Sequence, residues 1–269
     1  MPVFERNSLS INYQIIGSGP RVLFFNGSGG SIEGSQLLIN AFAKTCQVLV
    51  HDQRGLGKTS VPKGPYTMAD YANDAAALLD HVGWQTSNII GLSFGGMVAQ
   101  EFAVTFPDRI QRLVLMCTSA GGIAGSSYPL HQLAQLPTDE RNKALRLLTD
   151  TRFTDEWLAE HPVDAEIMRF QEDRPNSEKT TLQIEGERLQ LEARMDHDVA
   201  DRLHLISSPT LITAGRFDGI APLANSQAIA ERIAHSTLNV YEGGHPFLSQ
   251  DRQAMRDIRT FLSQSEPIN

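Results

Sequence analysis

The stretch Gly91-Leu92-Ser93-Phe94-Gly95 has the G-x-S-x-G spacing of a catalytic serine. It lies between SNIIGL, a run typical of a strand, and MVAQEFAVTF, a run typical of a helix, and this context gives the motif its weight. A serine in so sharp a turn needs small neighbours, because strand and helix pass close together two residues before and after it. Gly91 and Gly95 meet that need, so Ser93 is the expected nucleophile. The alternative is a chance match in a chain with 21 glycines.

A serine hydroxyl is a weak nucleophile, so it needs a general base and a group that orients that base. Both are expected later in the chain, at the ends of later strands. Asp218 follows the apolar run PTLITAG, and His245 follows STLNVYEGG. The run RLVLMC is followed by TSAGG, which offers no carboxylate and so favours Asp218 as the acid. The alternative role for Asp218 is to cap a turn before glycine.

Short apolar runs along the chain predict the strands that carry these residues. Continuous apolar runs are typical of strands buried on both faces of a parallel sheet that helices cover. The runs are RVLFF, QVLVHD, SNIIGL, RLVLMC, PTLITAG and STLNVYEG. The start, VFERNSLSINYQIIG, alternates more and predicts one or two antiparallel strands at the sheet edge.

From about Gly121 to His197 the sequence predicts helices and no strand. A helical block between two strands of a parallel sheet is most simply a lid over the edge where ligands bind. Four apolar residues of this block could line a pocket or pack the lid helices together: Phe153, Trp157, Met168 and Phe170. For Tyr128 and His131, near the lid entrance, the sequence leaves the same two roles open.

The composition is that of an ordinary globular protein and excludes some classes of partner. The chain has 269 residues, 41% of them hydrophobic, and a formal charge of −8, which gives no electrostatic attraction to nucleic acid or anionic membranes. Glu5 and Arg6 lie where a signal peptide needs its apolar core, and the apolar runs are too short to span a membrane. We therefore expect a cytoplasmic protein. Cys46 and Cys117 are expected to be core residues within buried strands.

Five segments together resemble the α/β-hydrolase fold family over nearly the whole chain: Asn26-Gly27, DQRGLGKTS, GLSFGG, GRFDGIAP and GGHP. The resemblance is closest to a small cytosolic branch with 3-oxoadipate enol-lactonases, carboxylesterases and cofactor-free haloperoxidases. It implies a mostly parallel twisted sheet with helices on both faces. Residues 1–121 and 197–269 would form this core, and residues 122–196 a helical lid.

The resemblance also implies an oxyanion hole made by the backbone N–H groups of Ser28 and Phe94. Relatives usually have His-Gly where this chain has Asn26-Gly27, so Asn26 is a candidate for holding the loop or touching the substrate. Family members with a Ser-His-Asp triad need neither a metal nor an organic cofactor.

The segment GLGKTS, Gly55 to Ser60, imitates the end of a phosphate-binding P-loop. The full motif requires glycine five residues before Gly57, and that position is Asp52. We expect a structural turn here, with Asp52 and Arg54 anchoring it by hydrogen bonds.

The leading hypothesis is a serine hydrolase that cleaves a small-molecule carboxylic ester or lactone through an acyl-enzyme. One alternative is hydrolysis of a C–C bond in diketones of the ring-cleavage type. Another is a hydrolase-fold receptor that binds a ligand with little turnover. Neither nucleic acid nor membrane is an expected partner, and the sequence leaves the substrate and the oligomeric state open.

Overall fold

The apolar runs of the sequence form one eight-stranded sheet in the computed structural model, which describes residues 1–172 and 179–264. Its strand order is β1-β2-β4-β3-β5-β6-β7-β8. The strands are β1 (Val3–Arg6), β2 (Leu9–Gly17), β3 (Arg21–Phe25), β4 (Gln47–His51), β5 (Ser87–Leu92), β6 (Ile110–Met116), β7 (Thr210–Gly215) and β8 (Ser236–Tyr241).

Strands β3 to β8 are parallel, and β1 and β2 form the antiparallel edge, as the sequence predicted. In the centre of the sheet, Leu23 of β3 is paired with Leu49 on one side and Ile89 on the other. Because the strands are parallel, their carboxyl ends meet at one edge, and the loops that leave this edge can share a site.

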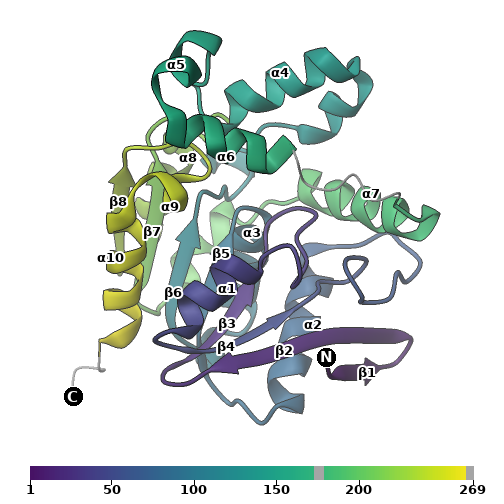
Figure 1. Cartoon of the computed structure of the whole chain (residues 1–269). Helices are drawn as coiled ribbons and strands as arrows, with labels where there is room; N and C mark the ends of the chain where they lie inside the picture. The colour runs from purple at the N-terminus through teal and green to yellow at the C-terminus, as the bar shows by residue number, and fades with distance from the viewer. Residues whose placement is uncertain (173–178, 265–269) are drawn as a thin grey trace.

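Helices cover both faces of the sheet (Figure 1). They are α1 (Gln36–Ala43), α2 (Met68–His81), α3 (Phe94–Thr105), α8 (Leu223–Ala230), α9 (Phe247–Gln250) and α10 (Arg252–Ser263). The short 3₁₀ turns are η1 (Pro107–Arg109), η2 (Gly122–Ala124), η3 (Leu130–Gln135) and η4 (Ala200–Leu205).

Alternate residues of the central strands feed two separate cores. Leu23 and Phe25 belong to the core beneath α2, α3 and α8, and Val22 and Phe24 to the core beneath α1 and α10. All four side chains are fully buried. The continuous apolar run RVLFF is therefore explained by a strand that has a core on each side.

Between β6 and β7 lie α4 (Thr138–Thr149), α5 (Asp155–Glu160), α6 (Pro162–Glu172) and α7 (Thr181–Met195). Figure 1 shows α4, α5 and α6 together at the top of the view, with α7 to their right. Among the described residues from 122 to 196, the chain forms helices and turns and no strand. No helix in the described ranges has both the length and the apolar character needed to cross a membrane.

The apolar residues singled out in this region have different surroundings. Phe153 and Met168 are buried. Trp157 stacks on the ring of His161, with centroids 3.7 Å apart, and its indole N–H donates to Asp164. These contacts favour a packing role for Trp157. The side chain of Phe170 lies outside the described residues.

The two cysteines are buried and free but do not lie within strands, contrary to expectation. Cys46 comes directly before β4, and Cys117 directly after β6. Cys46 belongs to the core under α1, as expected of a small apolar residue. The position of Cys117, one residue beyond a strand end, instead brings it to the edge where the candidate site lies.

Candidate active site

Ser93 occupies the sharp turn between β5 and α3. Its φ of 54° lies in the left-handed region, which is strained for a residue with a side chain. The turn is held on both sides of the serine: the Ser93 N–H donates to the Met116 carbonyl, and the Thr118 hydroxyl donates to the Ser93 carbonyl, both at 2.8 Å. These two hydrogen bonds hold the backbone of Ser93 in its strained conformation and so fix the position from which its hydroxyl projects.

The glycines around Ser93 are required by space. A Cβ atom on Gly91 would lie 2.6 Å from the Cα of Gly96, and one on Gly95 would lie 2.6 Å from the Asn26 carbonyl oxygen. Real Cβ atoms essentially never come so close to backbone. The close approach of Gly95 also shows that the elbow packs directly against the end of β3.

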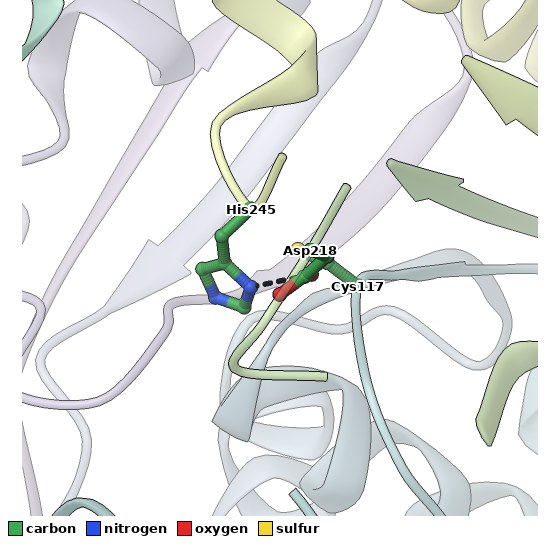
Figure 2. A group of neighbouring side chains, drawn as sticks. All are labelled: Cys117, Asp218 and His245. Atoms are coloured by element: carbon green, nitrogen blue, oxygen red, sulfur yellow. Dashed lines mark hydrogen bonds and ion pairs between the residues drawn. The ribbon is translucent and has the colours of Figure 1, made fainter. Parts of the chain in front are cut away.

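Ser93, His245 and Asp218 come together in the structure although they lie in three distant segments. The Nε2 atom of His245 lies 3.1 Å from Oγ of Ser93, and its Nδ1 lies 2.7 Å from Oδ2 of Asp218. Figure 2 shows the second of these bonds. When Nδ1 carries the proton for Asp218, Nε2 is free to accept the serine proton. The order is the one a serine nucleophile needs.

Asp218 is held for this task by its own loop. Its side chain is fully buried, and Oδ1 accepts the backbone N–H groups of Ile220 and Ala221, each at 2.8 Å. Both bonds fix the carboxylate with Oδ2 turned toward the imidazole. The turn-capping role that the sequence allowed is therefore present as well, on the other oxygen of the same carboxylate.

The end of α4 ties the loops of the acid and the base together. The His245 N–H donates to the Thr149 carbonyl at 2.7 Å, and the Gly219 N–H donates to the Leu148 carbonyl at 2.9 Å. Backbone bonds of this kind do not depend on side-chain identity, so sequence patterns give no signal for them. They make the region between β6 and β7 part of what positions Asp218 and His245.

The first loop, Asn26 to Gly30, packs against the elbow. A Cβ atom on Gly27 would lie 3.6 Å from the Cβ of Ser93. Within the described residues, neither the Ser28 N–H nor the Phe94 N–H donates a hydrogen bond. Phe94 begins α3, where N–H groups have no partner inside the helix. Both amides therefore remain available next to the serine.

Three contacts hold this loop. The Asp52 carboxylate accepts the Ile32 N–H at 2.7 Å, the Gln53 side chain donates to the Asn26 carbonyl at 2.9 Å, and the Gly29 N–H donates to Oε1 of Gln190 at 2.8 Å. Asp52 also accepts the Lys58 N–H, so the GLGKTS segment is the structural turn that the sequence predicted. Arg54 was also expected to anchor the GLGKTS turn, but its side chain instead pairs with Asp74.

Asn26 lies at the base of the first loop and is buried. Neither polar atom of its side chain has a hydrogen-bond partner among the described residues. The side chain packs beneath Gly30, where an added Cβ would lie 2.9 Å from the Asn26 Cβ. A buried amide without a partner is unusual in a folded protein, which keeps Asn26 a candidate for contact with a ligand.

Cys117 lies beside the acid and the base, a contact that sequence reasoning missed (Figure 2). Its Sγ, a carboxylate oxygen of Asp218 and a ring nitrogen of His245 lie within 4.8 Å of one another. Such a spacing suits a metal ion, but a metal here would compete with the bond between Asp218 and His245. The sequence did hold a signal for this contact, because Cys117 directly follows a strand and residues after strand ends, such as Asp218, were expected at the site.

The surroundings of His245 determine its protonation. Burial alone lowers the pKa of the imidazole, but the Cys117 sulfur and the Asp218 carboxylate raise it, and the net result lies well above the ordinary value of 6.5. An adjacent carboxylate favours the imidazolium in this way in any protein. An imidazolium at His245 is thus stabilised.

Comparisons with known proteins identify the family to which the fold belongs. The family model described as alpha/beta hydrolase fold matches residues 20–251. The chain is 30% identical over 254 residues to 3-oxoadipate enol-lactonase 2 of Acinetobacter baylyi, covering 91% of this chain and 92% of that protein. It is also 30% identical over 246 residues to a poly(3-hydroxyalkanoate) depolymerase of Ectopseudomonas oleovorans, covering 90% of this chain and 84% of that protein.

Two solved structures resemble the whole chain. A hydrolase from Pseudomonas aeruginosa PA01 has a TM-score of 0.75 at 28% identity and covers 98% of each chain. The enol-lactonase from Burkholderia xenovorans LB400 has a TM-score of 0.77 at 23% identity, over 98% of this chain and 100% of that one. At 23% identity, this similarity supports a shared fold only.

Proposed function

The chain belongs to the alpha/beta hydrolase fold family, and we propose that it is a serine hydrolase that cleaves a small carboxylic ester or lactone. One observation carries the proposal: Ser93, His245 and Asp218 form a continuous hydrogen-bonded series of 3.1 and 2.7 Å. The names of two relatives, a lactonase and a depolymerase, support an ester-type bond as the target.

In the proposed reaction, Oγ of Ser93 attacks the carbonyl carbon while Nε2 of His245 takes the hydroxyl proton. The tetrahedral intermediate collapses, and His245 returns the proton to the leaving oxygen, which leaves the acyl group on Ser93. Water then attacks the acyl-enzyme as His245 removes its proton. The bond from the acyl carbon to Oγ breaks, His245 returns the proton to Ser93, and the acid is released. Asp218 holds the imidazole tautomer throughout and stabilises the imidazolium.

The N–H groups of Ser28 and Phe94 would receive the negative charge that develops on the carbonyl oxygen. A backbone donor costs no reorganisation when the charge appears, and losing one such donor in other enzymes costs about 10²–10³ in kcat. The support for this assignment is that Gly27 packs on Ser93 and that neither amide has another acceptor among the described residues.

We assign residues 122–196 to a lid on a core of residues 1–121 and 197–269. The support is the position of α4 to α7 between β6 and β7 and the backbone bonds from the end of α4 to the loops of Asp218 and His245. A lid in this place would exclude water from the site and determine which substrates fit.

The test replaces Ser93 with alanine and measures hydrolysis of short-chain p-nitrophenyl esters and small lactones. Ser87→Ala is the control, because Ser87 is also a buried serine of the same strand-to-helix unit but lies at the far end of β5. Ester turnover should fall by about 10³-fold or more in Ser93→Ala and stay near wild type in Ser87→Ala. Undiminished turnover in Ser93→Ala would refute the assignment.

Two further measurements distinguish the alternatives. A fluorophosphonate probe should label the wild type at Ser93 and leave Ser93→Ala unlabelled. Failure to label the wild type would favour a binding protein with little turnover. Faster turnover of a vinylogous diketone than of any ester would favour hydrolysis of a C–C bond.

A further inference from the structure

A second set of polar groups surrounds a cavity of about 210 Å³ beside the elbow. Its walls come from α3, from the loop after β6, from the segment around η3 and from the end of α7. The side chains that matter for binding are Met97, Ser119, His131, Arg194 and His197. None of the described residues that line the cavity carries a carboxylate.

Arg194, in the last turn of α7, is a buried cation that forms no ion pair with any residue in the described ranges. It is 8% exposed, and its Nε and Nη2 atoms are buried with no hydrogen-bond partner among the described residues. Burial lowers the pKa of Arg194 to about 10, so the guanidinium still carries its charge at neutral pH. Arg54 shows the usual arrangement, since that partly buried arginine is bonded to the Asp74 carboxylate at 2.8 Å. In the part of the chain that the structure describes, Arg194 has no carboxylate partner.

Neutral hydrogen-bond donors accompany the cation. His197 is 5% exposed, and burial lowers its pKa to about 4, so its ring is uncharged at neutral pH and keeps one N–H. The Ser119 hydroxyl belongs to a small network with Ser127 and Asn225. The acids nearest in sequence, Asp196 and Asp198, line a different cavity, to which His197 also contributes. The described lining residues of the cavity beside the elbow therefore supply one cation and no anion to balance it.

Several residues of the cavity wall are close in the chain to Ser93 or to residues bonded to the elbow and the first loop. Met97 lies four residues after Ser93 in α3, about 6 Å along the helix axis. Thr118, one residue before Ser119, is bonded to the Ser93 carbonyl. Gln190, one turn before Arg194 in α7, is bonded to Gly29 of the first loop. One substrate a few bonds long could therefore reach both Ser93 and Arg194.

We propose that Arg194 binds a carboxylate of the substrate, so that the preferred esters or lactones are those with a free acid group a short apolar spacer from the scissile carbonyl. This proposal rests on the proposed function for its reaction but not for its binding site. A guanidinium forms paired hydrogen bonds with a carboxylate, and Met97 offers an apolar wall to the spacer. The acid product keeps the same carboxylate, so it should inhibit the enzyme.

The test compares substrates that differ only in charge. On the acyl side, p-nitrophenyl hydrogen glutarate is compared with its amide, p-nitrophenyl 4-carbamoylbutanoate. On the leaving-group side, 4-butyryloxybenzoate is compared with 4-butyryloxybenzamide. Each pair is measured with the wild type, Arg194→Met, Arg194→Lys and Arg188→Met. Arg188 is the matched control, because it lies in the same helix but is exposed and paired with Glu185.

In at least one pair, wild-type kcat/KM should favour the acid over the amide by about tenfold or more, mainly through KM. Arg194→Met should abolish this preference, Arg194→Lys should retain part of it, and Arg188→Met should leave it unchanged. Equal rates for acid and amide in both pairs with the wild type, or a preference that survives Arg194→Met, would overturn the proposal.

A binding measurement keeps the proposal testable if Arg194→Met does not fold or if no ester is turned over. Titration calorimetry on the wild type should show glutarate binding about tenfold or more tightly than glutaramide, and equal affinities would overturn the proposal. Failure of the hydrolase assignment would appear differently, as absent or Ser93-independent ester turnover with glutarate binding intact.

Discussion

Oγ of Ser93 and Nε2 of His245 lie 3.1 Å apart although 152 positions separate the two residues in the chain. The contact depends on the parallel sheet, which places the end of β5 and the loop after β8 at one edge. It also depends on α4, whose last residues bond to the His245 loop. The candidate site is thus a product of the whole topology.

Replacing Asp218 with asparagine should reduce kcat for esters by about 10³–10⁴, because the amide no longer selects the histidine tautomer that accepts the serine proton. The measurement is steady-state hydrolysis of p-nitrophenyl butyrate. Asp257→Asn is the control, since Asp257 accepts the Tyr241 hydroxyl bond away from the site. Activity of Asp218→Asn within tenfold of the wild type would remove Asp218 from the mechanism.

Replacing Cys117 with alanine should shift the pH dependence of kcat/KM toward acid. His245 must be unprotonated to act as a base, so activity rises with pH through its pKa. Cys117 is one of the groups that raise this pKa, and its removal should lower it. The midpoint of the rising limb should therefore move to lower pH.

The control for that shift is Cys46→Ala, a buried cysteine outside the site. Its pH profile should match that of the wild type. A Cys117→Ala profile with an unchanged midpoint would show that the sulfur does not influence the base.

Replacing Gly95 with alanine should destabilise the protein by about 1–3 kcal/mol and abolish ester hydrolysis, because the added Cβ meets the backbone at the end of β3. The measurements are thermal unfolding and p-nitrophenyl ester turnover. Gly34→Ala is the control, since the nearest atom to its Cβ would be 3.4 Å away. If Gly95→Ala behaved like Gly34→Ala, the tight packing of the elbow would be wrong.

The stability of the protein should fall as the pH drops from about 6.5 to about 4. Burial lowers the pKa of both His51 and His197 to about 4, so in this range the unfolded chain binds protons that the folded chain does not. Each histidine contributes of the order of 3 kcal/mol to this loss. His245 has a raised pKa, so its stabilising contribution is present below about pH 6.5 and is lost only as the pH rises above that value.

The check is the dependence of Tm on pH for the wild type and for His51→Gln. The variant should lose less stability between pH 6.5 and 4 than the wild type does, whatever its absolute Tm. His235 is exposed, and His235→Gln should keep the wild-type dependence. Equal slopes for the wild type and His51→Gln would contradict the buried, neutral state of His51.

Local patterns in the sequence predict much of this fold for physical reasons. A strand such as RVLFF is apolar on both sides because it has a core on each side, and Gly91 and Gly95 are dictated by backbone contact. The positions of Asp218 and His245 follow from strand ends. Each of these features can be predicted because the residues that reveal it in the sequence lie within a few positions of the feature itself.

Other parts of the site have no such local cause. Gln190 and Arg194 lie in an ordinary helical pattern, and only the packing of α7 against the first loop and the elbow brings them near Ser93. Cys117 resembles a core cysteine by composition, and its contact with His245 depends on where β6 ends relative to β8. Such contacts are set by tertiary packing across 101 to 161 positions of the chain.

The bond between the Gly29 N–H and Oε1 of Gln190 joins the first loop to α7. Under the proposed assignments of α7 to a lid and of the Ser28 N–H to an oxyanion hole, substrate entry and oxyanion stabilisation both depend on this bond. On that proposal, a movement of α7 away from the first loop would break the bond and release the loop that carries the Ser28 amide, so an open site would be a weaker catalyst than a closed one. The protein would then alternate between a state that admits ligands and a state that reacts, and Gln190 would set how strictly each state excludes the other.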